Sequence, residues 1–299
     1  MLLPKPQDLE PPRGLAAGPP KLTPEAKRVL QDLADDEPGA TASAISSSLH
    51  QNTGKKVSRW TVRRTLASSG VRYHRAVKKP ALTPAHRKRR REWAERHALW
   101  TDEDWNQVLF SDESSIELHS TRKKMGVYRK AAQRMDPKCL VGSVKQSPNL
   151  MVWGCFGNGR LGQLSFIDGT MDSTSYIRIL RPALPAAKRE VFDGGDFVFQ
   201  QDNASCHKSR MTMRWFQRHN FQVLDWPAQS PDLNPIENLW ATLKRKVDAK
   251  RPFKNMAALR EAAKAAWSEI GEDELCNLLS SMPLRVRLVR EAKGGTSEY

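Results

Sequence analysis

The chain has 299 residues, of which 39% are hydrophobic, so it is long enough for one large domain or two and can form a real core. It carries 49 Lys and Arg against 33 Asp and Glu, a formal net charge of +16, which favours a polyanionic partner. Four scattered cysteines argue against a disulfide framework, and no apolar run reaches the length of a signal peptide or membrane span, so we expect a soluble intracellular protein.

The first 75 residues predict a tail followed by a small helical domain. Residues 1–20 contain six prolines and few large apolar side chains, which indicates a disordered tail. Residues 21–75 predict three short helices, capped by Thr23, Thr41 and Ser58, with a glycine-bearing turn before a basic third helix. This order is typical of a helix-turn-helix DNA-binding domain, with a plain three-helix bundle as the alternative. The expected DNA contacts are Lys55, Lys56, Arg59, Arg63 and Arg64.

Residues 76–104 predict a basic linker. From Thr53 to Arg91 the chain holds fourteen basic residues and no acidic one, and such a block repels itself unless it meets a polyanion. The run at 86–91 fits a nuclear localisation signal with Lys78 and Lys79 as its upstream half, a DNA-backbone contact, or one solvated helix turn. Composition does not separate these three possibilities. The expected DNA contacts here are Arg87, Lys88, Arg89, Arg90 and Arg91.

From residue 105 to 299 the pattern changes to β-branched and aromatic runs alternating with helical stretches. This order predicts a mixed α/β sheet domain. The expected strands are 108–112, 115–119, 126–130, 150–156, 163–168, 197–201 and 221–225. The expected helices are 173–190, 208–219, 235–250, 255–269 and 272–281.

Three carboxylates at the ends of these elements carry the chemistry. Asp112 and Asp202 close predicted strands, and Glu237 lies in the first turn of a helix that begins near Pro235. Carboxylates that converge from different elements can hold two Mg²⁺ ions, which activate a nucleophile and stabilise a leaving oxygen in phosphodiester chemistry. Asn203 and His207 are auxiliary candidates, the histidine to position a water or phosphate, although a lone histidine is often structural. The competing carboxylates, interpreted as surface or turn residues, are Glu113, Asp168, Asp196 and Asp225.

The strings around these residues resemble the catalytic half of Tc/mariner superfamily DDE transposases. They are VLFSDES, LMVWGCF, FQQDNASCHKS and SPDLNPIENLW, and thirty-four residues separate Asp202 from Glu237, as in one branch of that family. The resemblance implies an RNase H-like catalytic domain with Asp112, Asp202 and Glu237 as catalytic metal ligands for two Mg²⁺ ions, for which Mn²⁺ substitutes. It also implies cut-and-paste transposition by a nuclear homodimer or larger assembly. Cleavage at inverted-repeat ends of double-stranded DNA would be followed by strand transfer into TA targets.

The amino-terminal part departs from the family pattern. Family members carry two helix-turn-helix units joined by an arginine-bearing hook, whereas here only the second unit is predicted and the hook position reads Gly18-Pro19-Pro20-Lys21. Because minor-groove readout depends largely on inserted arginines, we expect weakened recognition of specific ends and retained, salt-sensitive DNA binding. The alternative to an active transposase is a truncated or domesticated DNA-binding protein without catalysis.

Overall fold

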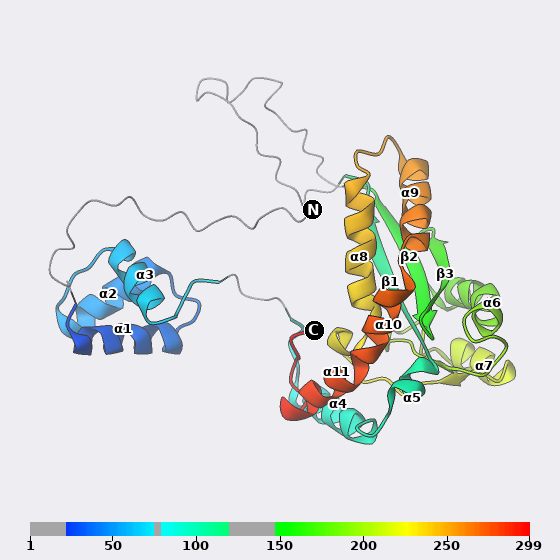
Figure 1. The fold of residues 1–299 in the computed structure, drawn as a ribbon, viewed down its shortest axis with the longest axis horizontal. Helices are drawn as coiled ribbons and strands as arrows, with labels where there is room; N and C mark the ends of the chain where they lie inside the picture. The colour runs from blue at the N-terminus through cyan, green and yellow to red at the C-terminus, as the bar shows by residue number, and fades with distance from the viewer. Residues whose placement is uncertain (1–21, 75–78, 120–146) are drawn as a thin grey trace. The chain divides into compact units, whose positions relative to one another are not determined.

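The computed structural model describes residues 22–74, 79–119 and 147–299. The chain divides into two compact units, and the boundary along the sequence falls between Lys78 and Lys79 (Figure 1). The predicted tail at 1–20, the hook at 18–21 and the strand at 126–130 lie outside the described residues. Across the described part, no helix is both long and apolar enough to cross a membrane.

The first unit is a three-helix domain, as predicted. Thr23, Thr41 and Ser58 each accept a hydrogen bond from the backbone N–H three residues later, so all three expected caps are present. Gly54 follows the second helix with a φ of 70°, a conformation that glycine adopts without a steric penalty. Leu30, among others, is fully buried in the shared core. The helices are α1 Pro24–Asp36, α2 Ala42–Thr53 and α3 Arg59–Ser68.

The second unit is built on a five-stranded mixed sheet with the order β3-β2-β1-β4-β5. The first three strands form an antiparallel meander, while β4 pairs in parallel with both β1 and β5. Only Val108 and Leu109 of β1 pair with β4, so β1 runs on beyond the end of its parallel neighbour. The strands are β1 Val108–Glu117, β2 Asn149–Gly157, β3 Arg160–Ile167, β4 Val198–Phe199 and β5 Gln222–Val223.

Helices cover both faces of this sheet (Figure 1). Because strand side chains alternate between faces, Phe110 joins one apolar core and Leu109 the other. The Phe110 side packs against α4, α5 and α8–α11, and the Leu109 side packs against α6 and α7. The helices are α4 Pro84–Arg96, α5 Asp102–Asn106, α6 Ser173–Glu190, α7 Arg210–Arg218, α8 Ile236–Ala249, α9 Met256–Ser268, α10 Glu272–Ser280 and α11 Met282–Glu291, with a 3₁₀ turn at Pro231–Leu233.

Three sequence predictions differ from this fold. The strands expected at 108–112 and 115–119 are one strand, because Asp112 to Ser115 continue the pairing with β2 without a break. The helices α4, α5 and α11 were not predicted. The linker expected at 76–104 is wrong for residues 79–104, since α4 belongs to the second unit and packs against α11, and the first three residues of that expected linker lie outside the described part.

Candidate active site

Ser111 ties together the three segments that carry the predicted catalytic carboxylates. Its N–H donates to Gln200 Oε1 at 3.1 Å, and its hydroxyl donates to the Gln200 carbonyl at 2.8 Å, two residues before Asp202. Its own carbonyl accepts from Asn234 Nδ2 at 3.3 Å, three residues before Glu237. Since Ser111 directly precedes Asp112, one buried residue brings all three segments to the same place.

Asp112 lies inside β1 rather than at a strand end, at the point where β1 has passed the end of β4. Its Oδ2 accepts a hydrogen bond from the indole N–H of Trp240 on α8 at 3.2 Å. The opposite residue on β2 is Gly154, where a Cβ would lie 2.8 Å from the tip of the Trp240 ring. A glycine at 154 therefore leaves room for the indole that holds Asp112.

Asp202 follows β4 and is fixed by the loop that it begins. Its Oδ1 accepts from the Ala204 N–H at 2.8 Å and lies 2.6 Å from His207 Nδ1. His207 is buried beneath Tyr176, with ring centroids 4.0 Å apart, and its Nε2 lies 3.3 Å from Glu113 Oε1. The histidine is thus placed to orient Asp202 and not to meet a water or phosphate from solvent, which corrects the auxiliary role expected for it.

Glu113, expected to be a surface or turn residue, is instead a neighbour of this site. Its half-buried side chain lies 3.3 Å from His207, and its charge helps to raise the pKa of Asp112. The other three competing carboxylates are exposed and paired with a basic residue, Asp168 with Arg260, Asp196 with Lys188 and Asp225 with Arg96. From the sequence, the alternation of side chains between the two faces of β1 could have indicated which face Glu113 occupies. It does not distinguish Glu113 from an ordinary surface residue.

The three carboxylates line one cavity of about 360 Å³, together with Asn203 and Asn234. Asn203 donates to the Trp226 carbonyl at 2.8 Å, so its amide holds the loop after β4. Among the described residues, no group of three or more His, Cys, Asp or Glu is already close enough together to hold a metal ion. The three carboxylates thus share one cavity without forming such a group in the described residues.

The acidic groups of this cavity repel one another. Burial, reinforced by the charges of Glu113 and Glu237, raises the pKa of Asp112 to about 8. Burial also raises the pKa of Glu237. Burial alone would lower the pKa of His207, but its hydrogen bond to Asp202 and the adjacent carboxylate of Glu113 outweigh that effect and raise the pKa to about 10. The histidine is therefore a fixed positive charge at neutral pH.

The predicted DNA contacts of the first unit form an exposed basic surface on and before α3. Lys56, Arg59, Arg63 and Arg64 are exposed, whereas Lys55 is half-buried and donates to the Thr23 hydroxyl at 3.2 Å. Trp60, 62% exposed, lies between Arg59 and Arg63, whose guanidinium carbons are 5.4 and 5.5 Å from its ring. The exposed basic surface therefore also contains an aromatic ring, which two guanidinium groups flank.

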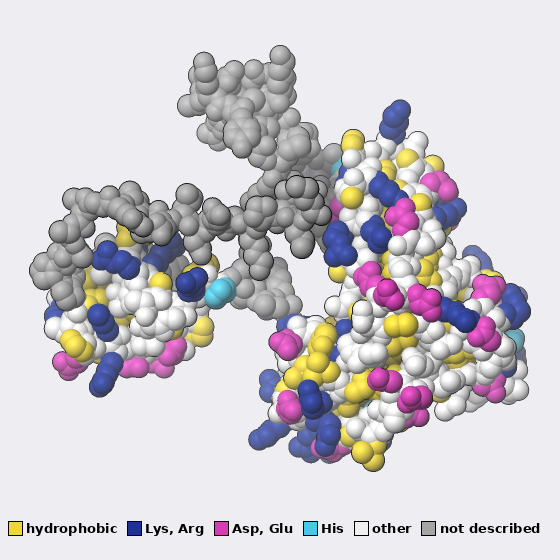
Figure 2. Space-filling view, viewed as in Figure 1, with side chains coloured by type: hydrophobic (Ala, Val, Ile, Leu, Met, Phe, Trp, Pro, Cys, Tyr) yellow, Lys and Arg dark blue, Asp and Glu magenta, His cyan; other side chains and the backbone are white. Residues whose placement is uncertain are grey.

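The basic block at 86–91 is split by the fold. Arg87, Lys88, Arg89 and Arg91 are exposed on α4, and basic side chains gather at this end of the second unit in Figure 2. Arg90 is fully buried and makes a two-point ion pair with Asp232, with both N–O distances at 2.7 Å. The prediction that Arg90 contacts DNA is therefore wrong, because its guanidinium is used inside the protein.

Comparison with known proteins identifies the family. The model of the DDE superfamily endonucleases matches residues 107–260, and a helix-turn-helix model described as a transposase matches residues 27–98. The Tcb1 transposase of Caenorhabditis briggsae is 36% identical over 266 residues, which cover 88% of this chain and 96% of that protein. The Tc1 transposase of Caenorhabditis elegans is 36% identical over 91% of this chain and 99% of its own length. The chain belongs to the Tc/mariner family of DDE transposases.

Solved structures of a Tc/mariner transposase confirm the fold class. The Mos1 mariner paired end complex with Mn is 18% identical, with a TM-score of 0.76 over 96% of this chain and 83% of that one. The corresponding complex with Mg gives the same TM-score over 97% and 84%. The predicted RNase H-like mixed sheet preceded by a helix-turn-helix domain is thereby confirmed for this Tc/mariner transposase.

Proposed function

We propose that this DDE transposase cleaves double-stranded DNA at the inverted-repeat ends of its element and joins the freed 3′ ends to TA targets. The observation that carries the proposal is the convergence of Asp112, Asp202 and Glu237 on one cavity through the hydrogen bonds of Ser111. The Tcb1 and Tc1 transposases, which this chain matches over 96% and 99% of their length, support it. Assembly as a homodimer or larger complex on DNA, in the nucleus, is part of the same proposal.

The residues of the cavity fit a pair of Mg²⁺ ions, with Mn²⁺ as a substitute. Asp112, Asp202 and Glu237 supply hard oxygen ligands, and the raised pKa of Asp112 shows that burial and the neighbouring carboxylates disfavour its charged form, an effect that a bound cation would offset. Mg²⁺ uses few protein ligands and keeps waters and substrate phosphates, so one or two of the carboxylates that line this cavity can serve each ion. Bound there, such ions would activate a water and stabilise the leaving oxygen.

The chain's own contribution is to hold these oxygens in place. Trp240 fixes one oxygen of Asp112, and His207 with the Ala204 N–H fixes one oxygen of Asp202, so the other oxygen of each is left for ligands. In hydrolysis a water oxygen bonds to phosphorus while the bond to the 3′ oxygen breaks and that oxygen leaves as a hydroxyl. In strand transfer the oxygen of this hydroxyl bonds to a target phosphorus while the bond from that phosphorus to the target's 3′ oxygen breaks, and that oxygen leaves as a hydroxyl.

A cleavage assay tests the proposal. The full chain is incubated with a plasmid that carries its element's ends, in Mg²⁺, in Mn²⁺ and in EDTA, and nicked and linear products are measured. We expect products with either ion and none in EDTA, because the carboxylates alone do not activate a water. DNA binding without products under all three conditions would contradict the proposal.

The raised pKa of Asp112 predicts that Mn²⁺ binding tightens as pH rises. Below about pH 8 this carboxyl holds a proton in the absence of a cation, and binding must displace that proton. Between pH 6.5 and 8 we expect the affinity to increase roughly tenfold, since a ligand must be deprotonated. His207 stays charged throughout this range and does not contribute.

Calorimetry in buffers of different ionisation enthalpy measures both the affinity and the proton release. Asp112→Asn is the matched control, because it keeps the shape of the side chain and removes the titrating group. Its binding should be weaker and lose most of the pH dependence. An unchanged pH dependence in this variant would assign the proton to another residue.

A further inference from the structure

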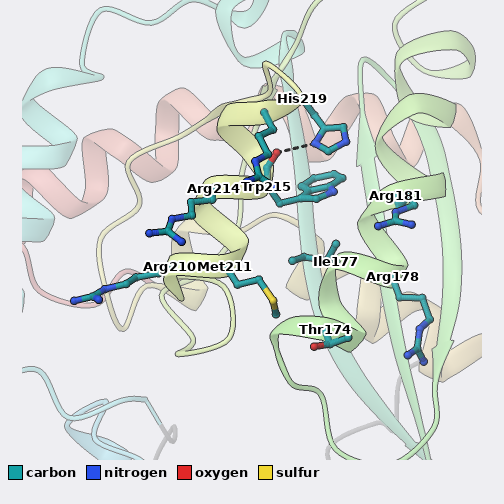
Figure 3. A pocket seen from close by; sticks show the side chains of 10 residues that line it. Thr174, Ile177, Arg178, Arg181, Arg210, Met211, Arg214, Trp215 and His219 are labelled. Carbon is teal, nitrogen blue, oxygen red and sulfur yellow. Dashed lines mark hydrogen bonds between the residues drawn. The ribbon is translucent and has the colours of Figure 1, made fainter.

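A second cavity, of about 880 Å³, lies between α6 and α7 and is bordered by arginines (Figure 3). Arg178 and Arg181 come from α6, and Arg210, Arg214 and Arg218 come from α7. In Figure 3 Ile177 and Met211 point into the space between the two helices, Arg178 and Arg181 extend from α6, and Arg210 and Arg214 extend from the side of α7 that faces away from α6. The cavity is therefore a groove with an apolar floor and basic rims.

These five arginines are exposed, and within the described residues none of them makes an ion pair or a hydrogen bond through its side chain. Other arginines of the same unit are paired, as Arg160 is with Asp193 and Arg189 with Glu190. No Asp or Glu occurs in residues 173–189 or 203–224, so neither helix offers a partner of its own within these stretches. Positive charges concentrated without counter-charges favour a polyanionic ligand.

The spacing of the arginines suits an extended ligand. Arg210, Arg214 and Arg218 are four residues apart, about 6 Å per step along a helix, so the row spans about 12 Å. A DNA strand carries one negative charge per about 3.4 Å of helix axis, so several phosphates would face such a row. Met211, 46% exposed on the groove floor, supplies the apolar contact that sugar carbons can use.

The groove starts at the loop that carries Asp202. Both helices are tied to this loop at their amino-terminal ends, because Ser173 and Thr212 each donate a side-chain hydrogen bond to the Cys206 carbonyl, at 3.3 and 2.7 Å. Tyr176 of α6 stacks on His207, which bonds to Asp202. A strand that leaves the catalytic cavity past this loop therefore meets the basic rims directly.

We infer that the groove between α6 and α7 binds the phosphate backbone of duplex DNA next to the catalytic cavity. The inference rests on the proposed function, and it adds a DNA-binding surface outside both the helix-turn-helix domain and the catalytic carboxylates. A DNA backbone accounts both for the arginines without ion-pair partners and for the position of the groove next to the loop that carries Asp202. An acidic protein segment or a second copy of the chain would account for the charge alone.

Salt-dependent binding of the full chain tests the inference. Fluorescence anisotropy with an unrelated 30-bp duplex is measured in EDTA at several salt concentrations, for the double variants Arg178→Gln/Arg181→Gln and Arg210→Gln/Arg214→Gln. Each phosphate contact contributes about 0.9 to the slope of log K against log salt, so we expect each variant to reduce the slope by about 2. Affinity at 100 mM salt should fall roughly 10- to 100-fold, by the same relation.

The matched control is Arg160→Gln/Arg189→Gln, which removes the same charge where each arginine already pairs with a carboxylate. It should keep a slope near that of the wild type, and equal slopes for groove and control variants would overturn the inference. So would a change in the sedimentation of DNA-free protein with unchanged DNA affinity, which would assign the groove to a second copy. Because no metal is present, failure of the proposed strand cleavage does not affect this result.

A crosslinking measurement locates the DNA without removing any arginine. A photoreactive benzophenone amino acid at Met211 should crosslink to the duplex, while the same group at the exposed Asp273 of α10 should not. Crosslinking at neither position, in a chain that binds the duplex normally, would contradict the proposed groove.

Discussion

Asp202→Asn will abolish metal-dependent strand cleavage and leave DNA binding unchanged. The asparagine keeps the size of the side chain and can still accept the Ala204 N–H bond, but it removes the negative charge that the ions need. Loss of that charge stabilisation should cost about 3–5 kcal/mol in the transition state, or roughly 10²- to 10⁴-fold in rate. The rate is followed by single-turnover cleavage of an end-labelled duplex, with anisotropy as the measure of binding.

Asp196→Asn is the matched control for this experiment. Asp196 is also an aspartate near β4, but its side chain is 97% exposed and pairs with Lys188. We expect cleavage by this variant at the wild-type rate. If Asp202→Asn also cleaves at that rate, the assigned triad is wrong; if neither variant nor the wild type cleaves, the non-catalytic DNA-binding protein becomes the better description.

Arg90→Ala will destabilise the second unit more than any other single change considered. The guanidinium is fully buried and satisfies both oxygens of Asp232, and it also donates to the carbonyls of Gly294 and Gly295 at 3.1 and 2.9 Å. Removing one partner leaves a buried carboxylate without its counter-charge, which typically costs about 3–5 kcal/mol. Urea denaturation of the full chain, followed by tryptophan fluorescence, measures the loss in unfolding free energy.

Arg91→Ala provides the comparison on the next residue of the same helix. Arg91 is exposed and lies 3.4 Å from Glu95, and an exposed pair of this kind contributes less than about 1 kcal/mol. Arg90→Lys keeps the charge but not the two-point geometry, so its loss in unfolding free energy should lie between the losses of these two variants. Equal stability of Arg90→Ala and Arg91→Ala would show that the buried pair does not stabilise the fold.

The buried Arg90–Asp232 pair also lies close in the chain to Glu237. Asp232 lies in the 3₁₀ turn five residues before Glu237, and Arg285 donates to the Asp232 carbonyl at 2.8 Å and to Asn238 Oδ1 at 2.7 Å. Two buried arginines therefore anchor the turn that precedes α8, the helix that carries Glu237. Burial alone would raise the pKa of Asp232, but Arg90 and Ser297 outweigh it and hold the pKa below its usual value.

Much of the fold follows from local pattern. The sequence predicted the helix caps at Thr23, Thr41 and Ser58 and the apolar stripe of α8. Such features are predictable because helix starts and helix faces depend on residues only a few positions apart. The helix α4 was missed for the opposite reason. Its charged sequence shows little apolar periodicity, and its position depends on Arg90 and Trp93 packing against distant parts of the chain.

The sequence by itself determined which carboxylates to examine, since Asp112, Asp202 and Glu237 stand in motifs with a specific spacing. It also determined the helix-turn-helix domain and the basic character of the chain. Only the tertiary structure decided the rest: Arg90 is an internal ion-pair partner, Glu113 pairs with His207, and Trp240 holds Asp112. The physical reason is distance along the chain. Arg90 and Asp232 are 142 residues apart and Trp240 and Asp112 are 128 apart, and only folding brings such pairs together.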